Sequence, residues 1–203
     1  MSTLNDFIAS VKAEGLAKTN RFLVRIAVPP ILNGTTDTVA LRKLELYCET
    51  AQLPGLSLST QQSRTFGEFR EMPYERLFDN ITLTFLIDNT FDTKAFFDSW
   101  INSVQKPGSR TFNYYNEYTT GIEIIVLDNL DAERHSVKLY ECYPKAITPI
   151  GLDYGSKEVM KLQVSINYRY WESSTTATQQ VTNEGPNVSD ASLYDTNPQP
   201  LTF

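Results

Sequence analysis

The stretch that decides the fold is Met160–Tyr170, which reads MKLQVSINYRY. Apolar and polar residues alternate throughout it, and this alternation predicts a β-strand with one buried face and one solvent-facing side. At about 3.3 Å per residue the strand would be about 40 Å long, the longest in the chain. Its apolar face would hold Met160, Leu162, Val164, Ile166, Tyr168 and Tyr170, and its polar face Lys161, Gln163, Ser165, Asn167 and Arg169.

Other stretches with strand character precede it and are bounded by Pro, Gly and Asn residues. We expect strands at 22–28, 44–50, 81–87, 122–127 and 137–143. One helix follows Asp92 or Thr90, either of which could cap it. Its apolar stripe is Phe96, Phe97, Trp100, Ile101 and Val104, and Pro107-Gly108 would end it.

These elements predict a mainly β fold: an antiparallel β-sandwich or barrel with one packed α-helix, an N-terminal helical arm and an extended C-terminal tail. The arm would cover residues 1–20 and the β-domain residues 21–172. In the arm, Leu4, Phe7, Ile8 and Val11 fall on one helical face, and Gly15 would end the helix. Residues 173–203 contain no Lys or Arg and form a polar extension without a core of its own.

Residues 56–80 are too polar to build a core and too long for a simple connection. We expect a projecting hairpin there whose charges pair across a subunit boundary. The charged residues proposed for this contact are Arg64, Glu68, Arg70, Glu71, Glu75 and Arg76.

Composition excludes several classes of protein. The 203 residues carry a formal net charge of −6, which disfavours binding to nucleic acid phosphates and to anionic membranes. No stretch approaches the roughly 20 apolar residues that span a bilayer, so we expect no membrane anchoring. Cys48 and Cys142 are expected to be free buried thiols in a protein made in a reducing cytoplasm, with a single disulfide as the alternative.

Catalytic chemistry has no support in the sequence. The one histidine, His135, lacks the ligand cluster of a zinc site and the nucleophile motif of a hydrolase, and we interpret it as a solvated turn residue. No nucleotide-binding motif is present. We therefore expect no catalytic, cofactor-binding or metal-binding residues and no cofactor. A glycan-binding β-sandwich is an alternative from another class, because Tyr114, Tyr115 and Tyr118 could stack on sugars, although packing is the commoner role of such a cluster.

Several ordered blocks resemble the tail tube proteins of contractile-tailed bacteriophages. The likeness covers about residues 4–172 and rests on the turn Thr50–Gly55, the strand Phe78–Phe85, the helix end Phe96–Trp100, and Tyr143–Tyr154 with the final Tyr170-Trp171-Glu172. The loop 28–41 and the tail 173–203 extend beyond the family pattern.

The resemblance implies a structural subunit rather than an enzyme. It implies stacked hexameric rings of this chain, with the inner sheets joined into one barrel and a central channel through which DNA passes as a non-specific passenger. The hairpin at 56–80 would contact neighbouring rings, the N-terminal helix would lie at subunit contacts, and the polar side chains of Lys161–Arg169 would lie near the channel. The implied partners are the sheath protein, baseplate or tube-initiator proteins and a tail terminator, in the tail of a virion assembled in the host cytoplasm. A baseplate tube-initiator ring of the same fold is the alternative within the family.

Overall fold

The computed structural model of the chain describes residues 3–34, 38–64, 67–155 and 157–174. Seven antiparallel strands form the body in the order β1-β6-β7-β8-β5-β2, and β9 pairs with the first half of β7. The mainly β, antiparallel fold class is confirmed. The strands are β1 Phe22–Ile26, β2 Cys48–Ala51, β5 Ile81–Leu86, β6 Thr120–Leu127, β7 Glu133–Ile147, β8 Lys161–Asn167 and β9 Tyr170–Ser173.

The longest strand is β7 rather than the final one, because the expected strand at 160–170 is divided into β8 and β9. Pairing with β7 stays in one register across the division, since Asn167 lies opposite Tyr143 and Tyr170 lies opposite Tyr140. Beside the division, Glu141 of β7 has a left-handed conformation, with a φ of 54°, and the register between β7 and β6 shifts by one residue, which is a β-bulge. Tyr170 stacks on Tyr140, with ring centroids 4.6 Å apart, outside the core.

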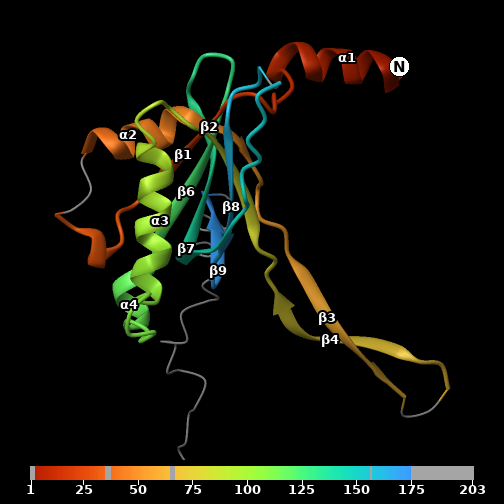
Figure 1. Ribbon diagram of the computed structural model, residues 1–203. Coiled ribbons are helices and arrows are strands. Elements are labelled where there is room, and N and C mark those ends of the chain that lie inside the picture. The colour runs from red at the N-terminus through yellow and green to blue at the C-terminus, as the bar shows by residue number, and fades with distance from the viewer. Residues whose placement is uncertain (1–2, 35–37, 65–66, 156, 175–203) are drawn as a thin grey trace, which may run out of the picture.

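The segment expected to be a strand at 44–50 is helical as far as Tyr47. Helix α2 (Thr38–Tyr47) leads directly into β2, and Leu44 is only 1% exposed. Leu41 packs against the same core, and its spacing from Leu44 is that of one helical face. Figure 1 shows α2 beside α3 (Asp92–Val104), so a second helix covers the body in addition to the expected one.

The core lies between the sheet and α3. Phe97 packs on Phe85 of β5 with ring centroids 5.0 Å apart, and Phe96 lies edge-on to Trp100. The indole Nε1 of Trp100 donates to the carbonyl of Tyr118, 2.8 Å away, in the short helix α4 (Tyr115–Tyr118). The helix expected at 92–104 is thus present, and aromatic packing rather than capping holds it in place.

Neither candidate cap bonds to the start of α3, because the N-cap position is Phe91 and no side chain caps the helix. Asp92 and Asp88 instead bind one ammonium group, with Lys43 Nζ 2.5 Å and 2.8 Å from their Oδ2 atoms. Thr90 donates to Asp88 or Asp92. The hydrogen bond from Lys43 lowers the pKa of both carboxyl groups. This cluster ties α2 to the start of α3.

Replacing Lys43 with Met is expected to lower the free energy of unfolding at neutral pH, because two neighbouring carboxylates lose their shared cation. The folded pKa values of Asp88 and Asp92 lie below the usual value, so their contribution is present above about pH 4 and is lost as the pH falls further. Urea unfolding at pH 7, 5 and 3 should show that the variant and the wild type differ less in free energy of unfolding as the pH falls. Lys157→Met, in an exposed loop, is the control. A difference that does not vary with pH would refute this role.

Candidate assembly surfaces

A two-stranded hairpin projects from the body over the predicted region. It consists of β3 (Ser57–Ser63) and β4 (Arg70–Leu77), which pair only with each other among the described strands. Figure 1 shows this ribbon extending away from the sheet. Apart from the half-buried Ser59, every side chain in the two strands is exposed. An isolated two-stranded hairpin is marginally stable in water, so this ribbon is suited to packing against another molecule.

The six charged residues predicted for subunit contacts all lie on this ribbon or its tip. The guanidinium of Arg64 lies over the ring of Phe69, 4.9 Å from its centroid. Within the part of the chain that the structure describes, none of the six forms an ion pair. The six are Arg64 beside β3, Glu68 at the tip, and Arg70, Glu71, Glu75 and Arg76 in β4.

Sequence reasoning missed the apolar side chains of the ribbon. Met72 is 56% exposed and Tyr74 is 66% exposed, in a strand otherwise rich in charge. Leu58, Phe69 and Leu77 are exposed as well. The signal in the sequence is weak, because a charged or polar residue adjoins each of these apolar residues. Exposed apolar side chains gathered on a single projection mark a contact surface.

The expected polar face of the last strand is present on β8. Lys161, Gln163, Ser165 and Asn167 alternate with the fully buried Leu162, Val164 and Ile166. Thr82 and Thr84 of β5 lie opposite Ser165 and Gln163 and extend the same face. Lys161 Nζ lies 2.6 Å from Glu49 Oε1, so its charge is balanced. We give the name polar face to six side chains, those of Lys161, Gln163, Ser165, Asn167, Thr82 and Thr84.

Arg169 has a different environment from the polar face. It lies where β8 gives way to β9, and its Nη1 donates to Glu141 Oε1 at 2.8 Å. Its backbone N–H donates to the carbonyl of Tyr140, 3.1 Å away. Arg169 therefore ties the junction of β8 and β9 to Tyr140 and Glu141 of β7.

The N-terminal helix carries a second exposed apolar surface. Helix α1 (Thr3–Glu14) ends as expected at Gly15, whose N–H bonds to the carbonyl of Val11 and whose φ is 77°. Figure 1 shows α1 projecting away from the body. Leu4, Phe7 and Ile8 are exposed along it. This stripe needs a partner if the helix is to be stable, because so short a helix is marginal alone.

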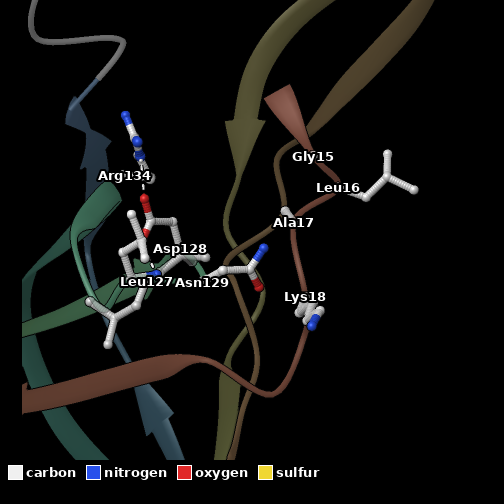
Figure 2. A pocket seen from close by; sticks show the side chains of 10 residues that line it. Gly15, Leu16, Ala17, Lys18, Leu127, Asp128, Asn129 and Arg134 are labelled. Atoms are coloured by element: carbon white, nitrogen blue, oxygen red, sulfur yellow. Dashed lines mark hydrogen bonds and ion pairs between the residues drawn. The ribbon is translucent and has the colours of Figure 1, made fainter. Parts of the chain in front are cut away.

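A cavity of about 690 Å³ lies between the segment after α1 and the turn joining β6 to β7. Figure 2 shows Gly15–Lys18 on one side of it and Asp128, Asn129 and Arg134 on the other. The Asp128 carboxylate accepts from the N–H groups of Leu130 and Ala132 and from Arg134 Nε. These bonds lower its pKa. Asp128 is thus engaged in holding the turn and is not a candidate general base.

Other candidates for site chemistry are structural. His135 lies in β7 opposite Val126, not in a solvated turn as expected. Cys142 is buried, Cys48 is half-buried, and both are free thiols whose pKa is raised to about 12 by burial. Among the described residues no cluster of three or more potential metal ligands is found, and no helix is long and apolar enough to cross a membrane.

The aromatic cluster considered for sugar binding packs mainly on itself. Tyr118 lies edge-on to Tyr115 and to Tyr143, with ring centroids 5.5 Å and 5.7 Å away. Burial and the nearby Glu141 carboxylate raise the pKa of Tyr115 to about 12. Tyr114 is exposed and outside this packing. The arrangement is that of interior and surface packing rather than a flat stacking platform.

The phage tail tube protein family profile matches residues 17–174, which include the body, the hairpin and the polar face. The chain belongs to the phage tail tube protein family. Members of this family are structural tail components, so this chain is a structural tail protein and not an enzyme. No curated protein matches its sequence closely enough to be identified as a relative.

Solved structures share the fold of this tail tube protein at low sequence identity. A chain of the anti-feeding prophage baseplate is 17% identical, with a TM-score of 0.59 over 78% of this chain and 95% of that one. A chain of the sheath–tube complex of an extracellular contractile injection system, PVC, in its extended state is 16% identical, with a TM-score of 0.56 over 85% and 97%. A chain of the anti-feeding prophage tube terminating cap is 18% identical, with a TM-score of 0.58 over 78% and 90%.

Proposed function

We propose that this tail tube protein is the repeating subunit of a hollow tube, assembled as hexameric rings that stack along one axis. The observation that carries the proposal is the β3–β4 ribbon, which is exposed on both faces and bears apolar side chains and charges that form no ion pair with the described residues. Such a ribbon gains stability only when another copy covers it. A second copy is also suited to cover the exposed apolar stripe of α1.

The wall of the channel is proposed to be the polar face. Its hydroxyl and amide side chains carry no charge, and its single lysine is balanced by Glu49. A neutral polar wall is wetted by water yet offers no cations to hold phosphates, so DNA would slide past it. This composition supports a conduit for DNA as a passenger.

The outer surface and the ends of the tube would meet the other tail proteins. We assign the sheath protein to the outside of the tube, a baseplate or initiator protein to one end and a terminator to the other. Synthesis in a host cytoplasm agrees with the two free thiols.

Negative-stain electron microscopy of the purified chain at high concentration tests the proposal. We expect rings with a stain-filled centre and, at higher concentration, stacks of rings. Copy number in purified particles separates the main tube from a baseplate initiator ring, because a main tube subunit is as abundant as the sheath protein. A particle with a single ring of this chain would favour the initiator.

A further inference from the structure

The N-terminal arm is attached to the body at one point and stands off from it at the next. The attachment is Arg21, whose Nη1 lies 2.5 Å from Asp131 Oδ1 and whose carbonyl accepts from the N–H of Leu127, 3.0 Å away. Between this residue and α1, residues 15–18 are separated from the β6–β7 turn by the cavity of Figure 2. We call this space the arm cavity. What fills it decides how firmly α1 is held to the body.

The wall of the arm cavity is partly apolar. Ala17 lines it on the arm, and Val126, Leu127 and Leu130 line it on the side of the turn. Leu130 is 86% exposed at the tip of the turn. An apolar side chain of an occupant would therefore find apolar partners there.

The charged residues around the arm cavity leave one positive charge without a partner. Arg134 lies 2.9 Å from Asp128, and Arg21 is paired with Asp131, so these four charges balance. Lys18 also lines the cavity and forms no ion pair with the described residues. An acidic occupant would balance this remaining charge.

The C-terminal extension of this chain begins beside the arm cavity. Strand β9 runs antiparallel to β7 and pairs with it as far as Ser173, so the chain leaves the sheet toward the start of β7. Ser174 Oγ accepts from the N–H of Ser136, 3.4 Å away, and Ser136 is two residues from Arg134 in β7. The match to the tail tube family ends at residue 174, and residues 175–203 lie outside the described residues. The extension is therefore an addition to the family fold that starts close to an unfilled space.

The sequence of the extension suits this space. Residues 175–203 contain no Lys or Arg. Val181 is the first large apolar residue after Ser174, and Glu184 is the first acidic one. The seven residues from Ser174 to Val181 reach up to about 23–25 Å when extended. A tethered segment also acts at a local concentration of about millimolar, so a weak contact is enough to keep it bound.

We propose that the C-terminal extension docks in the arm cavity of its own chain, with Val181 packed against Leu130. Glu184 then pairs with Lys18. The docked segment touches the arm on one side and the β6–β7 turn on the other, so it holds the arm to the body and fixes the direction of α1. Ring assembly plays no part in this contact, because every group in it belongs to one chain.

Tryptic cleavage after Lys18 tests the docking, because a docked extension shields this bond. A chain that ends at Ser174 should be cleaved there about tenfold faster than the full chain, since cleavage follows the population of the open form. The cut lies beyond every buried residue of the described part, so this chain should keep the circular dichroism spectrum of the full one. Cleavage after Lys157, in an exposed loop of the body, is the internal control and should be unchanged.

Removal of a single charge tests the ion pair. Glu184→Gln should speed cleavage after Lys18 about twofold to fivefold, because an exposed ion pair contributes little. Asp195→Asn removes one negative charge from the same extension and should leave the rate unchanged. Both variants are compared at concentrations at which sedimentation velocity shows single chains, so that contacts between copies do not shield the arm.

Disulfide trapping tests the apolar contact. Val181→Cys combined with Leu130→Cys should form a disulfide within one chain, detected by peptide mapping after mild oxidation. Val181→Cys combined with Tyr154→Cys, in an exposed loop, is the matched control and should form far less. The native thiols of Cys48 and Cys142 stay inert because burial raises their pKa to about 12.

Faster cleavage without the extension, together with the preferred link to position 130, supports the docking. Equal cleavage with and without the extension, or equal linking to positions 130 and 154, overturns it. Covalent dimers in place of the link within one chain would assign the cavity to the extension of a second copy and overturn it as well. None of these results bears on the proposed tube, because rings are absent at the concentrations used.

Discussion

A chain that lacks Ser57–Leu77 is expected to fold into a stable body and to form no tubes. None of the buried hydrophobic residues of the described part lies in this segment, so its removal leaves the core intact. The cut keeps Phe78, whose ring lies 6.1 Å from that of Tyr168, and Gly55, whose carbonyl accepts from Trp171 Nε1. Tubes are lost because the ribbon offers the exposed contacts proposed to join copies.

Circular dichroism should show β-rich secondary structure and a cooperative thermal transition for this deletion variant. Electron microscopy at concentrations where wild type forms stacked rings should show no stacks. Long tubes formed by the deletion variant would contradict the role of the ribbon. A change of Tyr154 to Ala, in an exposed loop, is the matched surface control and should leave assembly unchanged.

The largest effect on stability is expected for Trp100→Ala. Trp100 is fully buried, packs against Phe96 and Phe97, and donates its indole N–H to the carbonyl of Tyr118. Truncation leaves a cavity and an acceptor without its donor. A buried aromatic truncation of this kind lowers the free energy of unfolding by about 3–5 kcal/mol.

Urea unfolding followed by circular dichroism measures this loss. Phe112→Ala, also an aromatic truncation but at an exposed site, should change the free energy of unfolding by less than about 0.5 kcal/mol. Equal effects of the two variants would show that α3 is not anchored in the core as described.

The parts of the fold that the sequence predicts are those where one periodicity is sustained. Lys161–Asn167 alternates cleanly and forms β8, and the aromatic stripe at Phe96, Phe97 and Trp100 forms the buried face of α3. In both segments the local pattern and the tertiary burial agree, so pattern alone is sufficient.

Prediction failed where two patterns compete or where long-range geometry decides. Leu44 and Leu46 have the spacing of a strand, but Leu41 and Leu44 have that of a helix, and burial of Leu44 selects the helix. The division of the last strand lies beside Glu141, a residue distant in sequence that adopts a left-handed conformation in the partner strand. No single-segment pattern contains that information.

The candidate contact surface was also only partly predictable from the sequence, because long-range strand pairing decides its arrangement. The run of Arg and Glu residues from Arg64 to Arg76 indicates a solvated, projecting segment, and that much is visible in the sequence. Its two-faced arrangement depends on the register of β3 against β4, including the bulge at Tyr74, which only the paired strands reveal.

Sedimentation velocity of the full chain over a wide range of concentrations tests the central claim most directly, since that claim is that copies of this chain cover each other's exposed surfaces. The account predicts a closed species of six times the 23.1 kDa chain mass, and larger stacks as concentration rises. A single 23.1 kDa species at every concentration and in every buffer would contradict it.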